Sequence, residues 1–305
     1  MKRSYLNDEF FSRLESLAFN LRKDLGGFFG GKHLVTTYGQ TVEFADYREY
    51  MLGDDIRRID WNLYSRFEKY FIKLFTDERQ MHVQIYLDCS GSMGKVNPKK
   101  GAYAVGVAAA LGYLAIHNMD KVSYHLIKGN VAENPFGTLV GKQAFFRAMN
   151  TLDQIEFADE ADISTAVLGN PNTGTGDGLT VIISDFFSDS DWKKAVDYLL
   201  YKKKQILLVQ VFSPDELDPT YTDRVNLIDA ESVDMADPRN MKLRINKSMQ
   251  LAFKDAVAAF YADIRDFCKR RDAGIIALDC EKPIEKELFS ELLKRGTVSR
   301  DYSCL

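Results

Sequence analysis

Cysteine is scarce in this sequence, and the cysteines present do not form a pair typical of a metal site. The 305 residues include four cysteines, none of them in a C-x-x-C pair: Cys89, Cys268, Cys280 and Cys304. This spacing indicates neither a zinc site nor a framework of disulfide bonds. Because unpaired cysteines are typical of a reducing compartment, we expect a cytoplasmic protein.

The sequence also lacks a large excess of one charge and an apolar run long enough to cross a bilayer. Lys and Arg total 40 and Asp and Glu total 44, so the formal net charge is −4. Nucleic-acid-binding domains usually carry a basic excess. The apolar run Ala102–Ile116 is shorter than the roughly 20 residues that a spanning helix needs, and residues 1–25 lack the apolar segment of a signal peptide. We therefore predict no nucleic-acid partner and no membrane partner.

A change of pattern near residue 79 divides the chain. Residues 5–25 have the apolar spacing of an amphipathic helix, and the segment Asp46–Arg79 is dense in both charges. Strands and helices alternate after it. We predict two domains, a helix and β-rich extension over residues 1–79 and an α/β domain over residues 80–305.

The alternation in the second part of the chain predicts its fold class. The run Leu179–Ser184 is typical of a strand in the centre of a parallel sheet, where both faces are covered. We expect an α/β, Rossmann-like fold with a mostly parallel central sheet flanked by helices. The expected strands cover residues 81–88, 122–127, 179–184, 206–212 and 274–278, and the expected helices residues 99–118, 143–152, 192–203, 247–271 and 284–294.

The most informative segment follows the first of these strands. Asp88, Ser90 and Ser92 stand at alternate positions in a turn that contains glycine. Alternate residues of an extended loop point the same way, so their oxygens can meet at one point. In open α/β sheets ligands bind at this edge. A carboxylate and hydroxyls suit a hard cation, so we predict a Mg²⁺ or Mn²⁺ site with an open position for an acidic group from elsewhere.

A second aspartate follows another predicted strand. Asp185 comes directly after Leu179–Ser184, and if the two strands are neighbours, Asp88 and Asp185 face the same cleft. The alternative is that both aspartates are helix N-caps or turn residues. For Asp185 both interpretations stay open, whereas the Asp88, Ser90 and Ser92 spacing favours the metal site.

Two sequence stretches resemble known families. The Asp88-x-Ser90-x-Ser92 pattern after an apolar strand resembles the metal-ion-dependent adhesion site of von Willebrand factor A domains. Residues 48–61 match R-x-Y-x-x-G-D-x-x-R-x-I-D-W, which resembles the bacterial family called domain of unknown function 58. The likeness to that family extends over nearly the whole chain and includes the Ile-Ser-Asp-Phe stretch at residues 183–186.

The resemblance implies a von Willebrand A-like domain that binds a protein partner through a divalent metal. Relatives are often linked to MoxR-type AAA+ ATPases and to the assembly or maturation of other proteins. The family's second metal loop usually supplies a threonine, and Ala161 stands there in this sequence. Asp162, Ser164 or Thr165 could substitute, and the alternative is a weakened or metal-free site; we include Asp162 among the predicted metal ligands.

Two classes of function remain open at this stage. The first is a non-enzymatic module in which a metal at Asp88, Ser90, Ser92 and Asp185 captures an acidic side chain of a partner protein. The second is a metal-dependent hydrolase of the phosphoesterase kind that uses the same cleft. Such hydrolysis commonly needs a base, further carboxylates or a second metal, so the single carboxylate per loop favours binding.

Other residue patterns favour structural roles. The four histidines show no paired spacing. A Ser-His-Asp hydrolase places an aspartate and then a histidine after its serine, and the last histidine here is His125, on an early strand, so this class is not indicated. In the charged segment Arg48–Arg66 we expect the charges to pair and the aromatic residues to pack as a structural collar on the α/β domain, and a binding surface beside the cleft stays open as the alternative. Arg57 and Arg66 are the expected partners of Asp54 and Asp60.

Overall fold

The computed structural model describes residues 6–21, 33–35, 43–158, 160–187, 191–217, 223–227 and 241–301. It divides the chain into two compact units, Gly30–Gln80 and the remainder, Met1–Phe29 with Met81–Leu305. This division differs in one respect from the predicted domains 1–79 and 80–305. The first helix, α1 (Asp8–Leu21), belongs to the α/β unit, because Phe10, Phe11 and Leu14 are buried in its core.

The α/β unit is built on a seven-stranded sheet with the order β12-β9-β8-β4-β5-β6, in which β7 pairs with β5. Neighbouring strands from β12 to β5 are parallel, and only the short β6 and β7 run antiparallel to β5. The strands are β4 (His82–Asp88), β5 (Lys121–Lys128), β6 (Val131–Glu133), β7 (Thr138–Leu139), β8 (Leu179–Ser184), β9 (Gln205–Phe212) and β12 (Gly274–Asp279).

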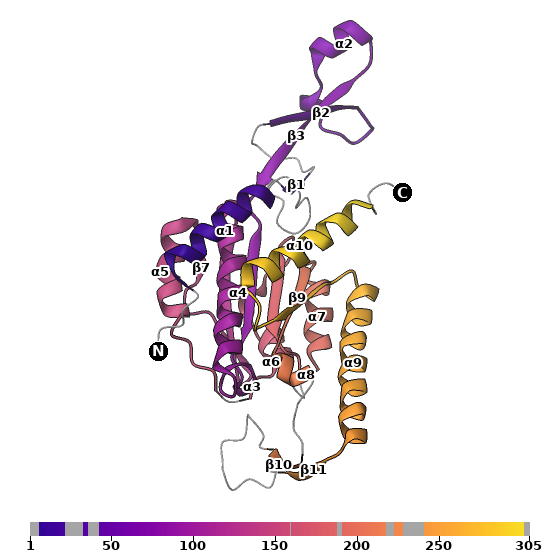
Figure 1. The fold of residues 1–305 in the computed structure, drawn as a ribbon. Helices are drawn as coiled ribbons and strands as arrows, with labels where there is room; N and C mark the ends of the chain where they lie inside the picture. The colour runs from indigo at the N-terminus through magenta and orange to yellow at the C-terminus, as the bar shows by residue number, and fades with distance from the viewer. Residues whose placement is uncertain are drawn as a thin grey trace. The chain divides into compact units, whose positions relative to one another are not determined.

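Helices cover both faces of this sheet (Figure 1). Val83, Ile85 and Leu87 of β4 are buried in the core that includes α1, α4 and α10, whereas Tyr86 is buried in the core that includes α6, α7 and α9. This period of two, with both faces apolar, is why the strands read as nearly continuous apolar runs. The helices are α3 (Gly91–Gly94), α4 (Pro98–His117), α5 (Gly141–Leu152), α6 (Ile163–Leu168), α7 (Trp192–Tyr201), α8 (Pro214–Leu217), α9 (Lys247–Arg270) and α10 (Ile284–Asp301).

These observations confirm the predicted fold class, an α/β unit with a mostly parallel central sheet flanked by helices. A short antiparallel pair, β10 (Asp223–Leu227) and β11 (Met241–Ile245), lies outside the central sheet. Among the described helices, none combines the length and the apolar composition that a membrane crossing requires.

The Gly30–Gln80 unit contains an antiparallel sheet with the order β1-β3-β2. Its elements are β1 (His33–Val35), β2 (Glu43–Glu49), the 3-10 turn η1 (Ile56–Arg58), α2 (Trp61–Phe67) and β3 (Phe71–Arg79). The motif at residues 48–61 therefore forms the connection from β2 to α2. Asp60 caps α2 by accepting hydrogen bonds from the backbone N–H groups of Asn62 and Leu63.

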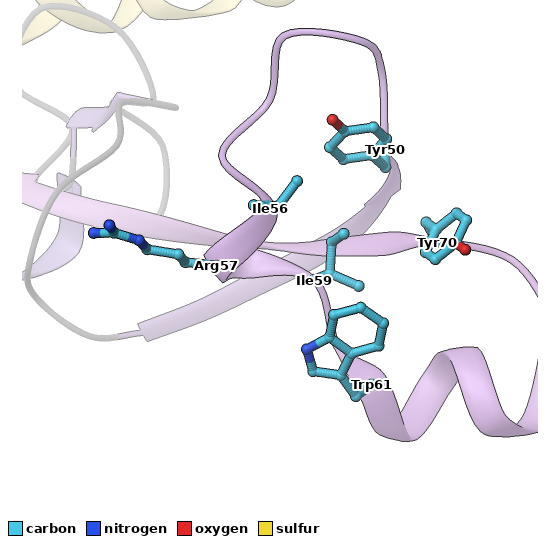
Figure 2. Close-up of a pocket in the computed structure, with 6 residues that line it drawn as sticks. All are labelled: Tyr50, Ile56, Arg57, Ile59, Trp61 and Tyr70. Carbon is cyan, nitrogen blue, oxygen red and sulfur yellow. The ribbon is translucent and has the colours of Figure 1, made fainter.

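The predicted collar differs from the observed one in its charge pairs, whereas its aromatic residues pack against one another as expected, with the rings of Tyr64 and Tyr70 stacked. Arg48 holds Asp54 at 2.8 Å and Lys73 holds Asp60 at 3.0 Å, so the predicted partners Arg57 and Arg66 were wrong. Trp61 packs edge-on to Tyr64 and Tyr70, and yet it is 61% exposed and not buried in a core. It lines an open pocket of about 490 Å³ together with Tyr50, Ile56, Arg57, Ile59 and Tyr70 (Figure 2).

Candidate functional site

The two strands that precede the predicted site are neighbours in the sheet. β4 and β8 pair in parallel, with Leu87 opposite Ile183. Their carboxyl ends therefore meet at one edge, as expected from the sequence. Asp88 ends β4 and is 1% exposed, and Asp185 follows β8 and is 2% exposed. A buried carboxylate is costly unless its charge is compensated, so the contacts of each aspartate decide what this edge can do.

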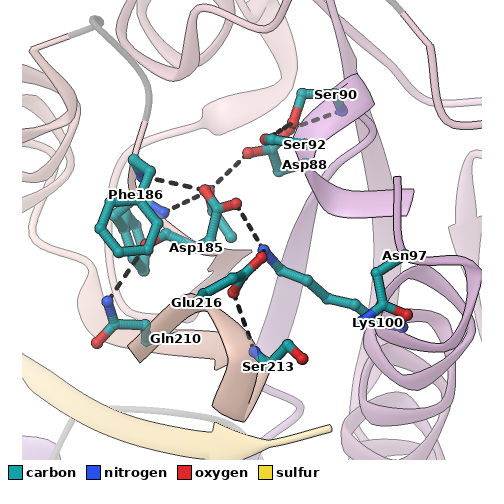
Figure 3. A network of polar contacts seen from close by, with 12 residues as sticks. Asp88, Ser90, Ser92, Asn97, Lys100, Asp185, Phe186, Gln210, Ser213 and Glu216 are labelled. Atoms are coloured by element: carbon teal, nitrogen blue, oxygen red, sulfur yellow. Dashed lines mark hydrogen bonds and ion pairs between the residues drawn. The ribbon is translucent and has the colours of Figure 1, made fainter. Parts of the chain in front are cut away.

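The carboxylate of Asp88 accepts hydrogen bonds from neutral donors. Its Oδ1 accepts from the backbone N–H of Ser90 at 2.9 Å, and its Oδ2 accepts from the hydroxyl of Ser184 at 2.6 Å. The hydroxyls of Ser90 and Ser92 lie 3.1 Å apart (Figure 3). The structure therefore brings together the three residues that the spacing predicted.

The shape of this loop is fixed by close packing behind it. Gly94 ends the single turn α3, and a Cβ at Gly94 would lie 2.4 Å from the ring of Phe157, so a larger residue does not fit there without rearrangement. Ala158, which follows Phe157 in the chain, donates its backbone N–H to the carbonyl of Cys89 at 3.0 Å. Glycine at position 94 thus lets the chain near Phe157 close over the Asp88 loop.

The electrostatics of Asp88 follow from its burial. Burial, with a smaller contribution from the charge of Asp185, raises the pKa of the Asp88 carboxyl to about 6, while the hydrogen bonds from Ser184 and Ser90 oppose this rise. At neutral pH the carboxylate is ionised for most of the time. Its contacts in the described structure do not include a cationic side chain that would balance this charge.

The buried carboxylate of Asp185 differs from that of Asp88 in its partners. Oδ1 of Asp185 accepts from the backbone N–H of Phe187 at 3.0 Å, and its main-chain carbonyl accepts from Nε2 of Gln210 at 3.2 Å. Its Oδ2 lies 2.8 Å from Nζ of Lys100. Phe186 turns the chain with a φ of 61°, in the left-handed region. Asp185 is therefore both a turn residue and one partner of an ion pair.

Lys100 is a buried cation at this edge of the sheet that the sequence pattern did not reveal. It lies in the first turn of α4, its side chain is fully buried, and its Nζ also contacts Oε1 of Glu216 at 2.7 Å. Burial by itself lowers the pKa of Lys100, but the charges of Asp185 and Glu216 outweigh this and raise the pKa above its ordinary value. A lysine at the start of an otherwise apolar helix could have drawn attention to it, because cations are unfavourable at helix N-termini.

The remaining predicted ligand, Asp162, has the contacts of a helix cap. Its carboxylate accepts from the backbone N–H of Thr165 at 3.0 Å and from the hydroxyl of Thr165 at 2.6 Å, at the start of α6. Ala161, at the expected threonine position, is buried. The contacts of Asp162 therefore do not join it to Asp88, Ser90 or Ser92.

The donor chemistry of the Asp88 loop fits a hard divalent cation. One carboxylate and two hydroxyls are the oxygen ligands that Mg²⁺ and Mn²⁺ accept, usually with several waters. Within the described ranges, no group of three or more His, Cys, Asp and Glu side chains gathers as a metal cluster. Asp88, Ser90 and Ser92 would hold the ion, and Asp185 and Asp162 have other partners.

His125 takes the structural role expected from the sequence. Nε2 of His125 lies 3.0 Å from the hydroxyl of Ser123, and its Nδ1 lies 3.1 Å from the amide of Asn170. Burial, with a smaller contribution from His82, lowers the pKa of His125 to about 4, so the ring is neutral at physiological pH. Its contacts are with these residues and with the stacked ring of Tyr86, and do not include the hydroxyls of Ser90 or Ser92.

Comparison with known proteins yields a family and several relatives. The chain is 24% identical over 274 residues to the uncharacterized proteins Rv1480 of Mycobacterium tuberculosis (strain H37Rv) and Mb1516 of Mycobacterium bovis, covering 88% of this chain and 84% of theirs. The model of the family described as "Protein of unknown function DUF58" matches residues 46–259.

Solved structures with a similar chain course include an aerotolerance-related membrane protein from Bacteroides fragilis and a von Willebrand factor type A protein from Catenulispora acidiphila. The first is 19% identical, with a TM-score of 0.41 over 70% of this chain and 99% of that chain. The second is 11% identical, with a TM-score of 0.38 over 73% of this chain and 44% of that chain. The family match includes both the motif at residues 48–61 and the Asp88 loop, and the chain belongs to the DUF58 family.

Proposed function

We propose that this chain is a non-enzymatic protein-interaction module. Asp88, Ser90 and Ser92 hold a Mg²⁺ or Mn²⁺ ion, and an acidic side chain of the partner completes the coordination of that ion. The family and the mostly parallel α/β fold support an interaction module in general. The bound metal and the acidic side chain of the partner are proposed in addition to this general role.

One observation carries the proposal. The buried carboxylate of Asp88 is contacted by the backbone of Ser90 and the hydroxyl of Ser184, both neutral, beside two hydroxyls 3.1 Å apart. A cation at this point would balance the charge of Asp88 and use the oxygens of Ser90 and Ser92. Because one carboxylate leaves a divalent ion with positive charge to spare, an acidic group from a partner would bind there favourably.

The resemblance to the family supplies a candidate for the partner. We propose a MoxR-type AAA+ ATPase, or a protein that such an ATPase assembles or matures. Purification of the tagged protein from its native cell, with and without a chelator, followed by mass spectrometry of captured proteins tests this point. Recovery of an AAA+ ATPase that the chelator and Asp88→Ala both abolish would support it, and recovery that neither changes would contradict it.

The metal itself is tested by titration with Mn²⁺ followed by electron paramagnetic resonance. We expect wild-type protein to bind one ion, and Asp88→Ala to lose this binding while circular dichroism shows an intact fold. Ser90→Ala combined with Ser92→Ala should weaken binding. Asp191→Ala, which removes a half-exposed surface carboxylate of the same unit, is the control and should leave binding unchanged. Binding that Asp88→Ala does not alter would contradict the site.

The non-enzymatic character is tested with the same proteins. A screen of phosphoester substrates with Mg²⁺ or Mn²⁺ should give no turnover above a heat-treated control. Robust turnover that Asp88→Ala abolishes would replace the interaction module with a metal-dependent hydrolase.

A further inference from the structure

We infer that Lys100 is the built-in cation of the Asp185 loop, and that it keeps Asp185 out of the coordination of any metal held by Asp88, Ser90 and Ser92. This inference rests on the proposed function for its metal, but it concerns a different residue and a different property. It predicts that the affinity of the site for a divalent ion is set by the ion pair between Lys100 of α4 and Asp185, which follows β8.

Every side-chain and main-chain oxygen of Asp185 already has a donor. Oδ1 accepts from the backbone of Phe187, Oδ2 from Lys100, and the carbonyl from the amide of Gln210. A carboxylate oxygen that accepts one hydrogen bond keeps a further lone pair, as the oxygens of Asp88 do, so these bonds alone do not bar Asp185 from a metal. The ion pair is the one that a metal would compete with, since two cations would then share one carboxylate.

Lys100 is held in place from two sides. Nζ lies between Oδ2 of Asp185 and Oε1 of Glu216, at 2.8 and 2.7 Å (Figure 3). The second oxygen of Glu216 accepts from the backbone N–H of Ser213 at 2.9 Å, which anchors Glu216 at the end of β9. The ammonium group is therefore fixed by an element on each side and is not free to swing away from Asp185.

The position of Lys100 indicates that its charge is needed there. Its side chain has no exposed surface, and burying an ammonium group costs several kcal/mol unless it is paired. It also stands in the first turn of a helix, where the helix dipole disfavours a cation. Asp185 is nearly as buried, at 3% side-chain exposure. The ammonium group thus gives Asp185 a buried counter-charge, which it shares with the 32%-exposed carboxylate of Glu216.

The consequence is a site with one carboxylate ligand where the topology provides two. Metal affinity in proteins rises with the number of charged ligands. Removal of the ammonium group of Lys100 should release Asp185 and convert it into a second carboxylate ligand. The wild-type site should then bind its ion more weakly than the variant.

Charge-matched variants separate this effect from a simple change in local charge. Lys100→Met combined with Glu216→Gln removes one cation and one anion and leaves Asp185 unpaired. Lys100→Met combined with Asp185→Asn removes the same charges but deletes the candidate ligand. Mn²⁺ affinity of both is measured by electron paramagnetic resonance and isothermal titration, beside the wild type and Asp88→Ala.

We expect the Lys100→Met/Glu216→Gln protein to bind Mn²⁺ at least about tenfold more tightly than the Lys100→Met/Asp185→Asn protein. The latter should bind within about threefold of the wild type. Equal affinity of the two double variants would overturn the inference and leave the proposed metal site standing. Binding by the Lys100→Met/Glu216→Gln protein but not by the wild type would support the inference and refute the proposed metal of the wild-type site. If neither the wild type nor either double variant binds Mn²⁺, the inference and the proposed metal site are both contradicted.

The comparison of the wild type with Lys100→Met/Asp185→Asn decides the matter if the other double variant fails to fold. Replacing both members of a buried ion pair is usually tolerated better than replacing one. If Asp185 were a ligand in the wild type, this variant would lose at least about tenfold in Mn²⁺ affinity, and that result would overturn the inference.

Discussion

The loops after β4 and β8 stand at the same edge of one sheet, and each begins with a buried aspartate, yet their charges are balanced differently. Asp185 faces the ammonium of Lys100 at 2.8 Å, whereas Asp88 accepts from the neutral donors Ser90 and Ser184. Position in the topology therefore does not by itself make an aspartate a metal ligand. The counter-charge that the protein already supplies distinguishes the two loops, and under the proposed function it is the Asp88 loop that binds an external cation.

The largest effect is expected from removing the internal cation. Lys100→Met should lower the free energy of unfolding by about 3–5 kcal/mol in the absence of metal, because it leaves Asp185 buried without its partner. Urea denaturation measures this loss. The adjacent Lys99→Met is the matched control, since Lys99 is exposed and its pair with Glu281 should contribute less than about 1 kcal/mol. Equal losses for the two variants would show that the Lys100 ion pair is not special.

An intermediate effect is expected from pH, and it concerns Asp88. Its folded-state pKa of about 6 lies above the ordinary value, so the folded protein takes up this proton more readily than the unfolded chain. The contribution of Asp88 to stability is therefore greatest when the carboxyl is protonated, and it falls as pH rises from about 4 through 6. By pH 7 the cost should reach about 3 kcal/mol, at 1.36 kcal/mol per pKa unit.

Comparison with Asp88→Asn isolates this titration from that of other groups. In metal-free buffer the variant should be more stable than the wild type at pH 7, and the difference should shrink as pH falls toward 5. His125 titrates in the opposite sense, because its lowered pKa costs stability as pH falls below about 6.5, but it is common to both proteins and cancels in the difference. A difference that does not vary with pH would contradict the uncompensated charge.

The smallest effect is expected at Asp162. Asp162→Ala should cost about 1 kcal/mol of stability, because the backbone N–H of Thr165 loses its cap at the start of α6. Mn²⁺ affinity should stay within about twofold of the wild type. Asp162→Ser, which retains a capping oxygen, should recover most of the stability. A large loss of Mn²⁺ affinity in either variant would place Asp162 among the ligands after all.

The sequence predicted those parts of the molecule that depend on local pattern. The apolar run Leu179–Ser184 and the alternation of strands with helices predicted the parallel sheet, and the spacing of Asp88, Ser90 and Ser92 predicted the gathered oxygens. Both properties follow from backbone geometry over a few residues. The assignment of α1 to the α/β unit could not be predicted from local geometry, because the contacts of α1 with α4 and α10 join residues far apart in the chain.

The parts of the site that could not be predicted depend on long-range pairing. Lys100 lies 85 residues from Asp185 and 116 from Glu216, and nothing near Lys100 in the sequence names either partner. The collar shows the same limit, since Asp60 pairs with Lys73 on β3 and not with a nearby arginine. Trp61 packs against Tyr64 and Tyr70 as expected, but it lines an open pocket of the Gly30–Gln80 unit and stays largely exposed.

The contrast between the two loops can be tested most directly in crystals grown with Mn²⁺, by measuring anomalous scattering at the manganese absorption edge. We expect one strong peak within coordination distance of a carboxylate oxygen of Asp88 and of the hydroxyls of Ser90 and Ser92, with the ion pair of Lys100 and Asp185 still closed. A peak bound by Asp185, with Lys100 displaced, or no peak at this edge of the sheet, would contradict this expectation.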